Sequence, residues 1–346
     1  MYKENNNKIL IMNLKKNNHY SVASKILHYL ALNYPLITQT SFEIEKLFNK
    51  NIARSADKLV KPVFISGLAR SGSTLITRLL YDTNAFVSLT YRNMPFILMP
   101  NIWGKFAAAF RKDIAEFERP HNDGIKVNYD SPEAFDEVFW RIYSGNDYIR
   151  DSYLENYQPT QQLQEDYSLY IKLITNNSIK GRYLSKNNNN ILRLQTIANI
   201  FPDANIIIPF RDPIQQAFSL LKQHRNFHEI AKNDSFSVKY MNWLGHYEFG
   251  VNNKYFKFPN NIVMPNDQDN IDYWITQWIN VYNFVLNNAP KNAIFICYEE
   301  LCAAPQEQLS KLFNILNVKK FNEQAYEIIK PSISHKIDIA DSSLIE

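Results

Sequence analysis

The sequence predicts an α/β fold of three layers, in which a central parallel sheet is flanked by helices on both faces. Three segments carry this prediction, because in each a short apolar run rich in β-branched or aromatic residues precedes a helical pattern. These segments are residues 62–80, 205–223 and 293–316. Strands that alternate with helices favour parallel pairing, since the chain must cross over the sheet between neighbouring strands.

A helical lead-in is expected ahead of these units. Residues 20–50 carry apolar side chains at helical spacing on both sides of Pro35. Neither a Gly/Ser-rich linker nor an internal repeat appears, so we expect a single α/β domain over residues 59–346. It is preceded by the N-terminal lead-in over residues 1–58. Residues 95–164, rich in aromatic and acidic side chains, are expected to form helices and loops that cap the sheet and shape a cleft.

Composition indicates an ordinary globular protein. Hydrophobic residues make up 45% of the chain, with 22 Phe, 21 Tyr and 5 Trp, and charged residues make up 21%. The net charge of +4 is small for 346 residues, and no run of Lys and Arg predicts a nucleic-acid partner. The asparagine run at residues 187–190 is attributed to composition.

Two features bear on location and redox state. Cys297 and Cys302 match no metal-ligand spacing and are expected to be reduced thiols, partly buried. No apolar run of signal-peptide or membrane length follows the N-terminus. We therefore expect a cytoplasmic protein that does not span a membrane.

The segment after the first predicted strand has the form of an anion-binding loop. Gly67 and Gly72 frame four residues before a helix, where backbone amides and the helix dipole favour a phosphate group. The nucleotide triphosphatase form continues with a lysine, but here Ser73 follows. Arg70 supplies a planar cation instead, and this set does not by itself require a metal ion. The residues expected to bind the anion are Gly67, Arg70, Ser71, Gly72, Ser73 and Thr74.

The strand at residues 205–210 also leads directly into a predicted helix. Arg211 follows this strand, Pro213 begins the helix, and Ser219 follows Arg211 by eight residues. Ser219 therefore lies about two turns into the helix, on a face that can meet Arg211.

Together these motifs resemble the PAPS-dependent sulfotransferase family (PAPS is 3'-phosphoadenosine 5'-phosphosulfate), in the form of its bacterial and tyrosylprotein members. The resemblance covers residues 62–316 and implies a fold like that of the P-loop NTPases. It implies PAPS as the sulfuryl donor, 3'-phosphoadenosine 5'-phosphate (PAP) as the product, and no metal cofactor. It also implies that Arg211 and Ser219 bind the 3'-phosphate, and Arg70 the phosphosulfate.

Lys186 extends this resemblance, and one departure limits it. Lys186 lies 25 residues before Arg211, where tyrosylprotein-type members carry a lysine that contacts the bridging oxygen of the donor. Those members also carry a glutamate base about twenty residues after the loop arginine, but residues 89–94 here contain no acid. Tyrosine sulfation is therefore not implied, and the base must come from elsewhere. The stretch 298–301 resembles a family segment that is usually structural.

Two side chains are candidates for the general base. His121, next to Asp123, has an ordinary pKa near 6.5 and needs little tuning to accept a proton. Glu133 follows Ser131-Pro132, at a predicted helix start, where it could instead complement the helix dipole. Three further histidines are rivals that we expect to line the cleft or the surface: His224, His228 and His246.

The leading interpretation is a sulfotransferase acting on a hydroxyl of a sugar, a glycan or another small molecule. The first alternative is a P-loop kinase or NTPase-like phosphotransferase, although the loop lacks its lysine. The second is a non-catalytic nucleotide-binding protein that has kept the loop and lost turnover. The sequence leaves the acceptor open among a sugar, a lipid-linked glycan, a phenol and an alcohol, and it leaves the oligomeric state open.

Overall fold

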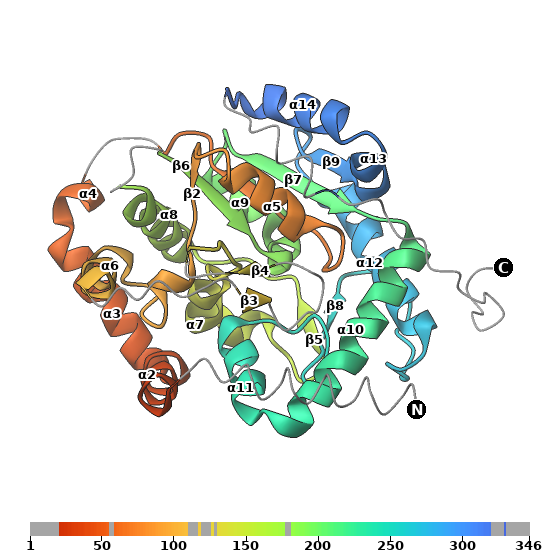
Figure 1. Cartoon of the computed structure of the whole chain (residues 1–346), viewed down its shortest axis with the longest axis horizontal. Coiled ribbons are helices and arrows are strands. Elements are labelled where there is room, and N and C mark those ends of the chain that lie inside the picture. Colours follow the sequence, from red (N-terminus) through yellow and green to blue (C-terminus); the bar gives the residue numbers. More distant parts are fainter. Residues whose placement is uncertain are drawn as a thin grey trace.

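A five-stranded parallel sheet forms the centre of the protein in the computed structural model (Figure 1). The structure describes residues 21–54, 59–109, 117–118, 126–127, 130–176, 181–319 and 329. The strand order is β2-β6-β1-β7-β9, and every neighbouring pair is parallel. The predicted fold class is confirmed. The strands are β1 (Val63–Ile65), β2 (Phe86–Val87), β6 (Arg182–Lys186), β7 (Asn205–Phe210) and β9 (Ile294–Cys297).

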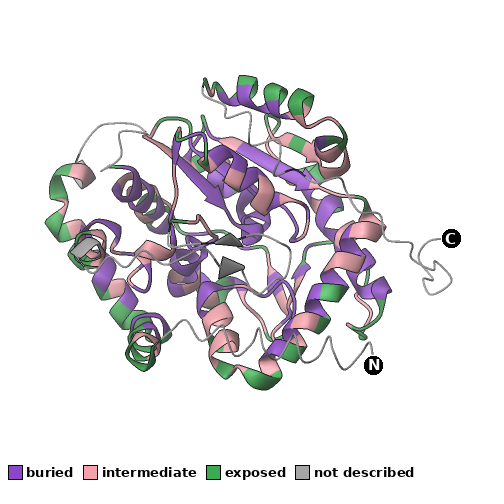
Figure 2. Cartoon of the chain, viewed as in Figure 1, coloured by how far each residue is buried: buried purple, intermediate pink, exposed green. Residues whose placement is uncertain are grey.

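Side chains of the central strands alternate between two cores, one on each face of the sheet. Val63 and Ile65 belong to the smaller core, whereas Phe64 belongs to the larger one. Both faces are therefore covered, as a parallel sheet requires, and Figure 2 shows the sheet as buried. The smaller core is completed by α5 (Ser73–Tyr81), α13 (Tyr298–Ala303) and α14 (Pro305–Leu316).

The larger core contains most of the aromatic side chains. Trp274, Trp278 and Tyr282, whose spacing predicted core positions, pack here, and the indole of Trp274 is fully buried. The helices on this side are α7 (Glu137–Tyr148), α8 (Gln161–Thr175), α9 (Leu194–Ile200), α10 (Pro213–Asn233) and α12 (Ile271–Asn288).

Within the lead-in, the described helices are α2 (Val22–Asn33), α3 (Pro35–Phe48) and α4 (Lys50–Arg54). Leu32 and Phe42 join the larger core, while Val22 and Phe48 are exposed. Glu45 of α3 is fully buried and accepts hydrogen bonds from the backbone amides of residues 101 and 102. Its carboxylate thus caps α6 (Pro100–Ala109), where a negative charge is favourable.

Short elements fill the remaining described segments. Residues 95–164, expected as helices and loops, also contribute three short strands. One pair is antiparallel and the other parallel. These elements are η1 (Tyr91–Asn93), β3 (Phe117–Glu118), β4 (Lys126–Val127), β5 (Tyr153–Glu155), η2 (Asn188–Arg193), α11 (Ser235–Leu244) and β8 (Tyr255–Lys257). Cys297 and Cys302 are both free and half-buried, as expected.

The asparagine run at residues 187–190 is structural, which corrects its attribution to composition. All four side chains are buried. Asn187 donates to Glu137 at 2.7 Å, and the Arg193 guanidinium donates to both oxygens of the same carboxylate at 2.7 and 2.8 Å. Since a buried charge needs both an opposite charge and hydrogen bonds, the run satisfies groups that an apolar segment would leave unpaired.

Candidate functional site

The loop between β1 and α5 depends on its two glycines. Gly72 caps α5 at φ +89°, and a Cβ atom there would come within 2.4 Å of the Tyr298 ring. At Gly67 a Cβ atom would lie 2.7 Å from the carbonyl oxygen of Pro209. Both positions therefore exclude side chains. Because α5 begins at Ser73, the end of the loop lies at a helix N-terminus, where an anion is favoured.

Gln216 of α10 fixes the backbone of this loop. Its side-chain amide donates to the carbonyl oxygens of Leu68 and Ala69 at 3.2 and 2.9 Å. Its own oxygen accepts from the Trp278 indole at 3.0 Å, and the side chain is fully buried. Gln216 was not predicted from the sequence, because a helical pattern does not show which glutamine contacts a distant loop.

Arg70 links the two predicted anion sites. Its Nε donates to the Ser219 hydroxyl at 3.1 Å, across 149 positions of sequence. Ser219 lies on α10, so the loop arginine and the helix serine, expected at opposite ends of one ligand, are in direct contact. Arg70 itself has φ +68°, a backbone conformation that turns the chain sharply just before Gly72.

Arg211 lies against the segment that begins α13. Its Nε is 3.4 Å from a carboxylate oxygen of Glu299, and its guanidinium lies 5.0 Å from the centre of the Tyr298 ring. Burial raises the pKa of Tyr298 to about 12, while the positive charges of Arg211 and Arg70 act in the opposite direction. Tyr298 therefore lies close to Gly72 and to Arg211, so this segment contacts both predicted sites.

Lys186 and Glu133 form a buried ion pair. The ammonium lies 3.0 Å from the Glu133 carboxylate, and the side chains are only 9% and 10% exposed. Lys186 ends β6, next to β1, and Ile65 is its register partner. The backbone amide of Glu133 donates to the carbonyl oxygen of Leu89 at 3.4 Å. Glu133 thus places a carboxylate beside residues 89–94, a stretch that contains no acidic residue of its own.

A histidine and a second carboxylate lie beside this pair. His246 Nδ1 is 3.2 Å from a Glu248 oxygen, which also accepts from Asn188 at 2.7 Å. Burial lowers the pKa of His246, but the Glu248 carboxylate outweighs it and the net shift is upward. Burial would raise the pKa of Glu248, but His246 holds it at about 2. His246 was named from the sequence only as a rival, and Glu248 was missed.

One cavity, of about 130 Å³, is lined by the Lys186–Glu133 pair together with Arg70, whereas Arg211 and Ser219 do not line it. The predicted residues that line it are Arg70, Ser73, Thr74, Glu133 and Lys186. His246, Glu248 and Asn188 line it too, and apolar side chains of α10 and α11 form another wall. His121 and Asp123 lie outside the described residues. His224 packs on Trp274 and its Nδ1 accepts from the amide of Gly250 at 3.1 Å, which is a structural role.

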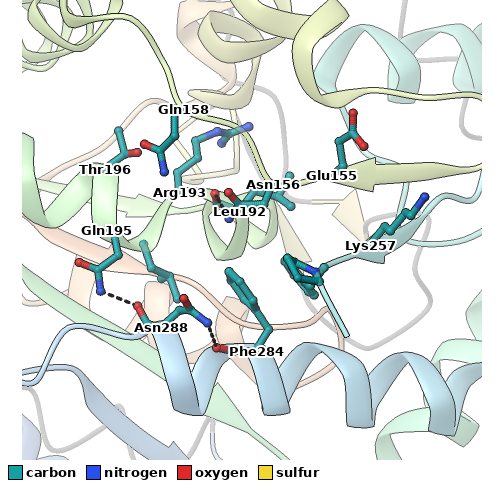
Figure 3. Close-up of a pocket in the computed structure, with 13 residues that line it drawn as sticks. Glu155, Asn156, Gln158, Leu192, Arg193, Gln195, Thr196, Lys257, Phe284 and Asn288 are labelled. Carbon is teal, nitrogen blue, oxygen red and sulfur yellow. Dashed lines mark hydrogen bonds between the residues drawn. The ribbon is translucent and has the colours of Figure 1, made fainter. Parts of the chain in front are cut away.

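A larger hollow, of about 470 Å³, lies elsewhere (Figure 3). It is bordered by β5, α9, β8 and α12, and no predicted site residue lines it. Its amide groups are used within the protein: Gln195 donates to the Asn288 carbonyl at 2.7 Å, and Asn288 to that of Phe284 at 2.9 Å. We therefore place the candidate site in the smaller cavity, where the charged groups converge.

The described part of the chain contains no group of three or more His, Cys, Asp or Glu that could hold a metal ion. None of its helices combines the length and the apolar character needed to cross a membrane. The cytoplasmic location stays a prediction.

One protein family matches the greater part of the chain. A model of the sulfotransferase family matches residues 62–323. Among solved structures, a sulfotransferase from Mycobacterium avium is similar, with a TM-score of 0.48, 13% identity, and coverage of 91% of this chain and 78% of that one. A sulfotransferase from Mycobacterium tuberculosis H37Rv gives a TM-score of 0.48 at 14% identity, covering 95% of this chain and 86% of that one. Among curated proteins, no sequence matched the chain.

Proposed function

The chain belongs to the sulfotransferase family, and we propose that it transfers a sulfuryl group from PAPS to a hydroxyl group of a small-molecule acceptor. One observation carries the proposal. Arg70, Lys186 and Arg211 follow three neighbouring parallel strands, and Arg70 contacts Ser219 of the second motif at 3.1 Å. A donor with anionic groups at two separate positions suits this arrangement.

The residues present fit such a donor. The loop from Gly67 to Thr74 would hold the phosphosulfate with its backbone amides and the Arg70 guanidinium. Arg211 and Ser219 would hold the 3'-phosphate. No step needs a metal ion, because the side-chain cations and the helix N-terminus can offset the charge on the leaving phosphate.

Lys186 and Glu133 would act where the bond changes occur. PAPS supplies the sulfuryl group, whose sulfur bonds to the acceptor oxygen as its bond to the phosphate oxygen breaks. Lys186 would offset the negative charge that develops on that phosphate oxygen, together with Arg70. The acceptor hydroxyl would lose its proton to Glu133, which lines the same cavity as Lys186. His121 remains a second predicted base outside the described residues.

Thermal unfolding with PAP tests the donor site. A ligand that binds only the folded state at a hundred times its Kd stabilises it by about 2.7 kcal/mol. We expect PAP to raise the Tm of the wild type but not of Arg211→Ala. Arg225→Ala is the matched control, because it removes an exposed arginine from α10, the helix that follows Arg211. Magnesium–ATP should give no comparable shift.

The outcomes separate the alternatives. A Tm shift with magnesium–ATP alone would refute the donor assignment and favour a phosphotransferase. A shift with PAP but no sulfuryl transfer to any hydroxyl in a broad panel would favour the non-catalytic nucleotide-binding protein. A shift with PAP that persists in Arg211→Ala would remove Arg211 from the donor site.

A further inference from the structure

One wall of the cavity is mainly apolar. Phe227 and Ile230 of α10, Met241 and Leu244 of α11, and Phe249 of the following loop all line it. Four of them are buried and Met241 is half-buried. The polar groups of the cavity on this side come from Ser237, Tyr240 and His246.

Close backbone packing holds this wall in place. Gly250 has φ +82°, and a Cβ atom there would lie 2.9 Å from Cβ of Phe227. The Phe227 and Phe249 rings are 4.8 Å apart. At the end of α11, Gly245 caps the helix at φ +72°, and the amide of His246 donates to the Met241 carbonyl at 3.0 Å. The loop therefore cannot move off α10 without breaking these contacts.

The apolar wall continues toward the surface. A second hollow, of about 30 Å³, shares six lining residues with the cavity: Phe227, Ile230, Met241, Phe249, Ser237 and His246. It extends along residues 249–252 to Val251, which is 48% exposed. An elongated molecule could therefore lie along α10 and α11 with one end at the charged groups.

We propose that the acceptor is an alcohol or a phenol with an elongated apolar body, which lies along α10 and α11 and presents its hydroxyl group to Lys186, Glu133 and His246. This inference rests on the proposed function and narrows its acceptor. A sugar carries hydroxyl groups on all sides, and burying them against carbon surfaces costs free energy unless each finds a partner. Along this wall, Phe227, Ile230, Leu244 and Phe249 offer carbon surfaces, and Ser237 and Tyr240 are the residues of α11 that add hydroxyl groups.

A ladder of primary alcohols from 1-butanol to 1-octanol, with glucose and phenol beside it, tests the inference by sulfuryl transfer from PAPS. Each buried methylene contributes about a fourfold gain in binding, so kcat/KM should rise by about that factor per carbon until the hollow is full. This gain should come mainly from a lower KM. Met241→Gln should flatten the ladder, while Met264→Gln, a half-buried methionine elsewhere, should not.

The PAP-dependent Tm shift is measured on every variant, so that folding and the donor site are checked separately. We expect Met241→Gln to keep this shift. A flat alcohol ladder, or faster transfer to glucose than to any alcohol, would overturn the inference and leave the proposed function standing. Loss of the PAP shift in Met241→Gln would also overturn it, because the wall would then belong to the donor site. No PAP shift and no transfer with the wild type would overturn both.

Discussion

Replacing Gln216 by leucine should loosen the loop between β1 and α5 (the phosphate loop, from Gly67 to Thr74) without changing any residue proposed to bind the donor. The change removes three hydrogen bonds: those to the carbonyl oxygens of Leu68 and Ala69, and the one from the Trp278 indole. A buried hydrogen bond contributes about 1 kcal/mol net, so Gln216→Leu should lower the free energy of unfolding by about 3 kcal/mol. The unfolding entropy of a chain this long, about 0.7 kcal/mol per kelvin, turns this loss into about 4 °C of Tm.

The functional consequence is a lower affinity for the donor product, PAP. With both carbonyl groups released, the loop amides are no longer held in one orientation, and we expect the affinity for PAP to fall about tenfold, equal to 1.4 kcal/mol. Gln216→Glu should weaken PAP binding further, because it keeps an acceptor for Trp278 but places a carboxylate beside the loop carbonyls. Thermal unfolding and calorimetric titration with PAP measure the two effects.

Gln306→Leu serves as the control, since it makes the same substitution at an exposed position of α14. It should leave both the Tm and the PAP affinity unchanged. If Gln216→Leu unfolds within about 1 °C of the wild type and binds PAP equally well, Gln216 does not fix the loop. A fall in Tm with unchanged affinity would show that the side chain stabilises the fold but does not position the loop.

Three further outcomes are expected. Glu133→Gln should lower kcat by ~10²–10⁴ while the PAP-induced Tm shift remains; the opposite pattern, with His121→Ala inactive and Glu133→Gln active, would make His121 the base. Arg193→Met should lower the free energy of unfolding, measured in urea, by about 3–5 kcal/mol, because it leaves the Glu137 carboxylate buried without its cation. Adding Glu137→Gln should recover part of that loss, and no recovery would show that the pair is unimportant. Burial holds the pKa of His224 at about 4, so as the pH drops the unfolded chain gains a proton there before the folded one does, and the free energy of unfolding should fall between about pH 6.5 and 4. His224→Asn should remove this loss, measured by urea unfolding at a series of pH values. An unchanged pH dependence in this variant would contradict the prediction.

The parts of the site that the sequence predicts are local ones. A strand, a loop framed by Gly67 and Gly72, and the helix after it are contiguous, so their pattern is visible without any knowledge of distant contacts. Arg211 is visible for the same reason, because it follows an apolar strand and precedes a helix that starts with proline. Each of these predictions needs only about ten to fifteen neighbouring residues, the reach of periodicity and capping rules.

The parts that the sequence does not predict depend on distant contacts. Glu133 pairs with Lys186 across 53 residues. The helix start predicted at Glu133 is wrong, because α7 begins at Glu137. His246 and Glu248 reach the cavity because α11 ends at Gly245, and the asparagine run is buried because Glu137 and Arg193 lie beside it. No local rule distinguishes a buried asparagine from an exposed one, since both suit a turn.

The order of the strands explains why the three cations lie along one edge of the sheet. Lys186, the phosphate loop and Arg211 follow β6, β1 and β7, which are adjacent and parallel, so all three leave the same edge of the sheet. Neighbouring strands lie about 4.8 Å apart, which spreads the cations over about 10 Å along this edge. A ligand with one anionic group could engage only one end of that row, whereas a donor with a phosphosulfate and a separate 3'-phosphate could engage both. The spacing that favours such a donor is therefore a property of the sheet and not of any single motif.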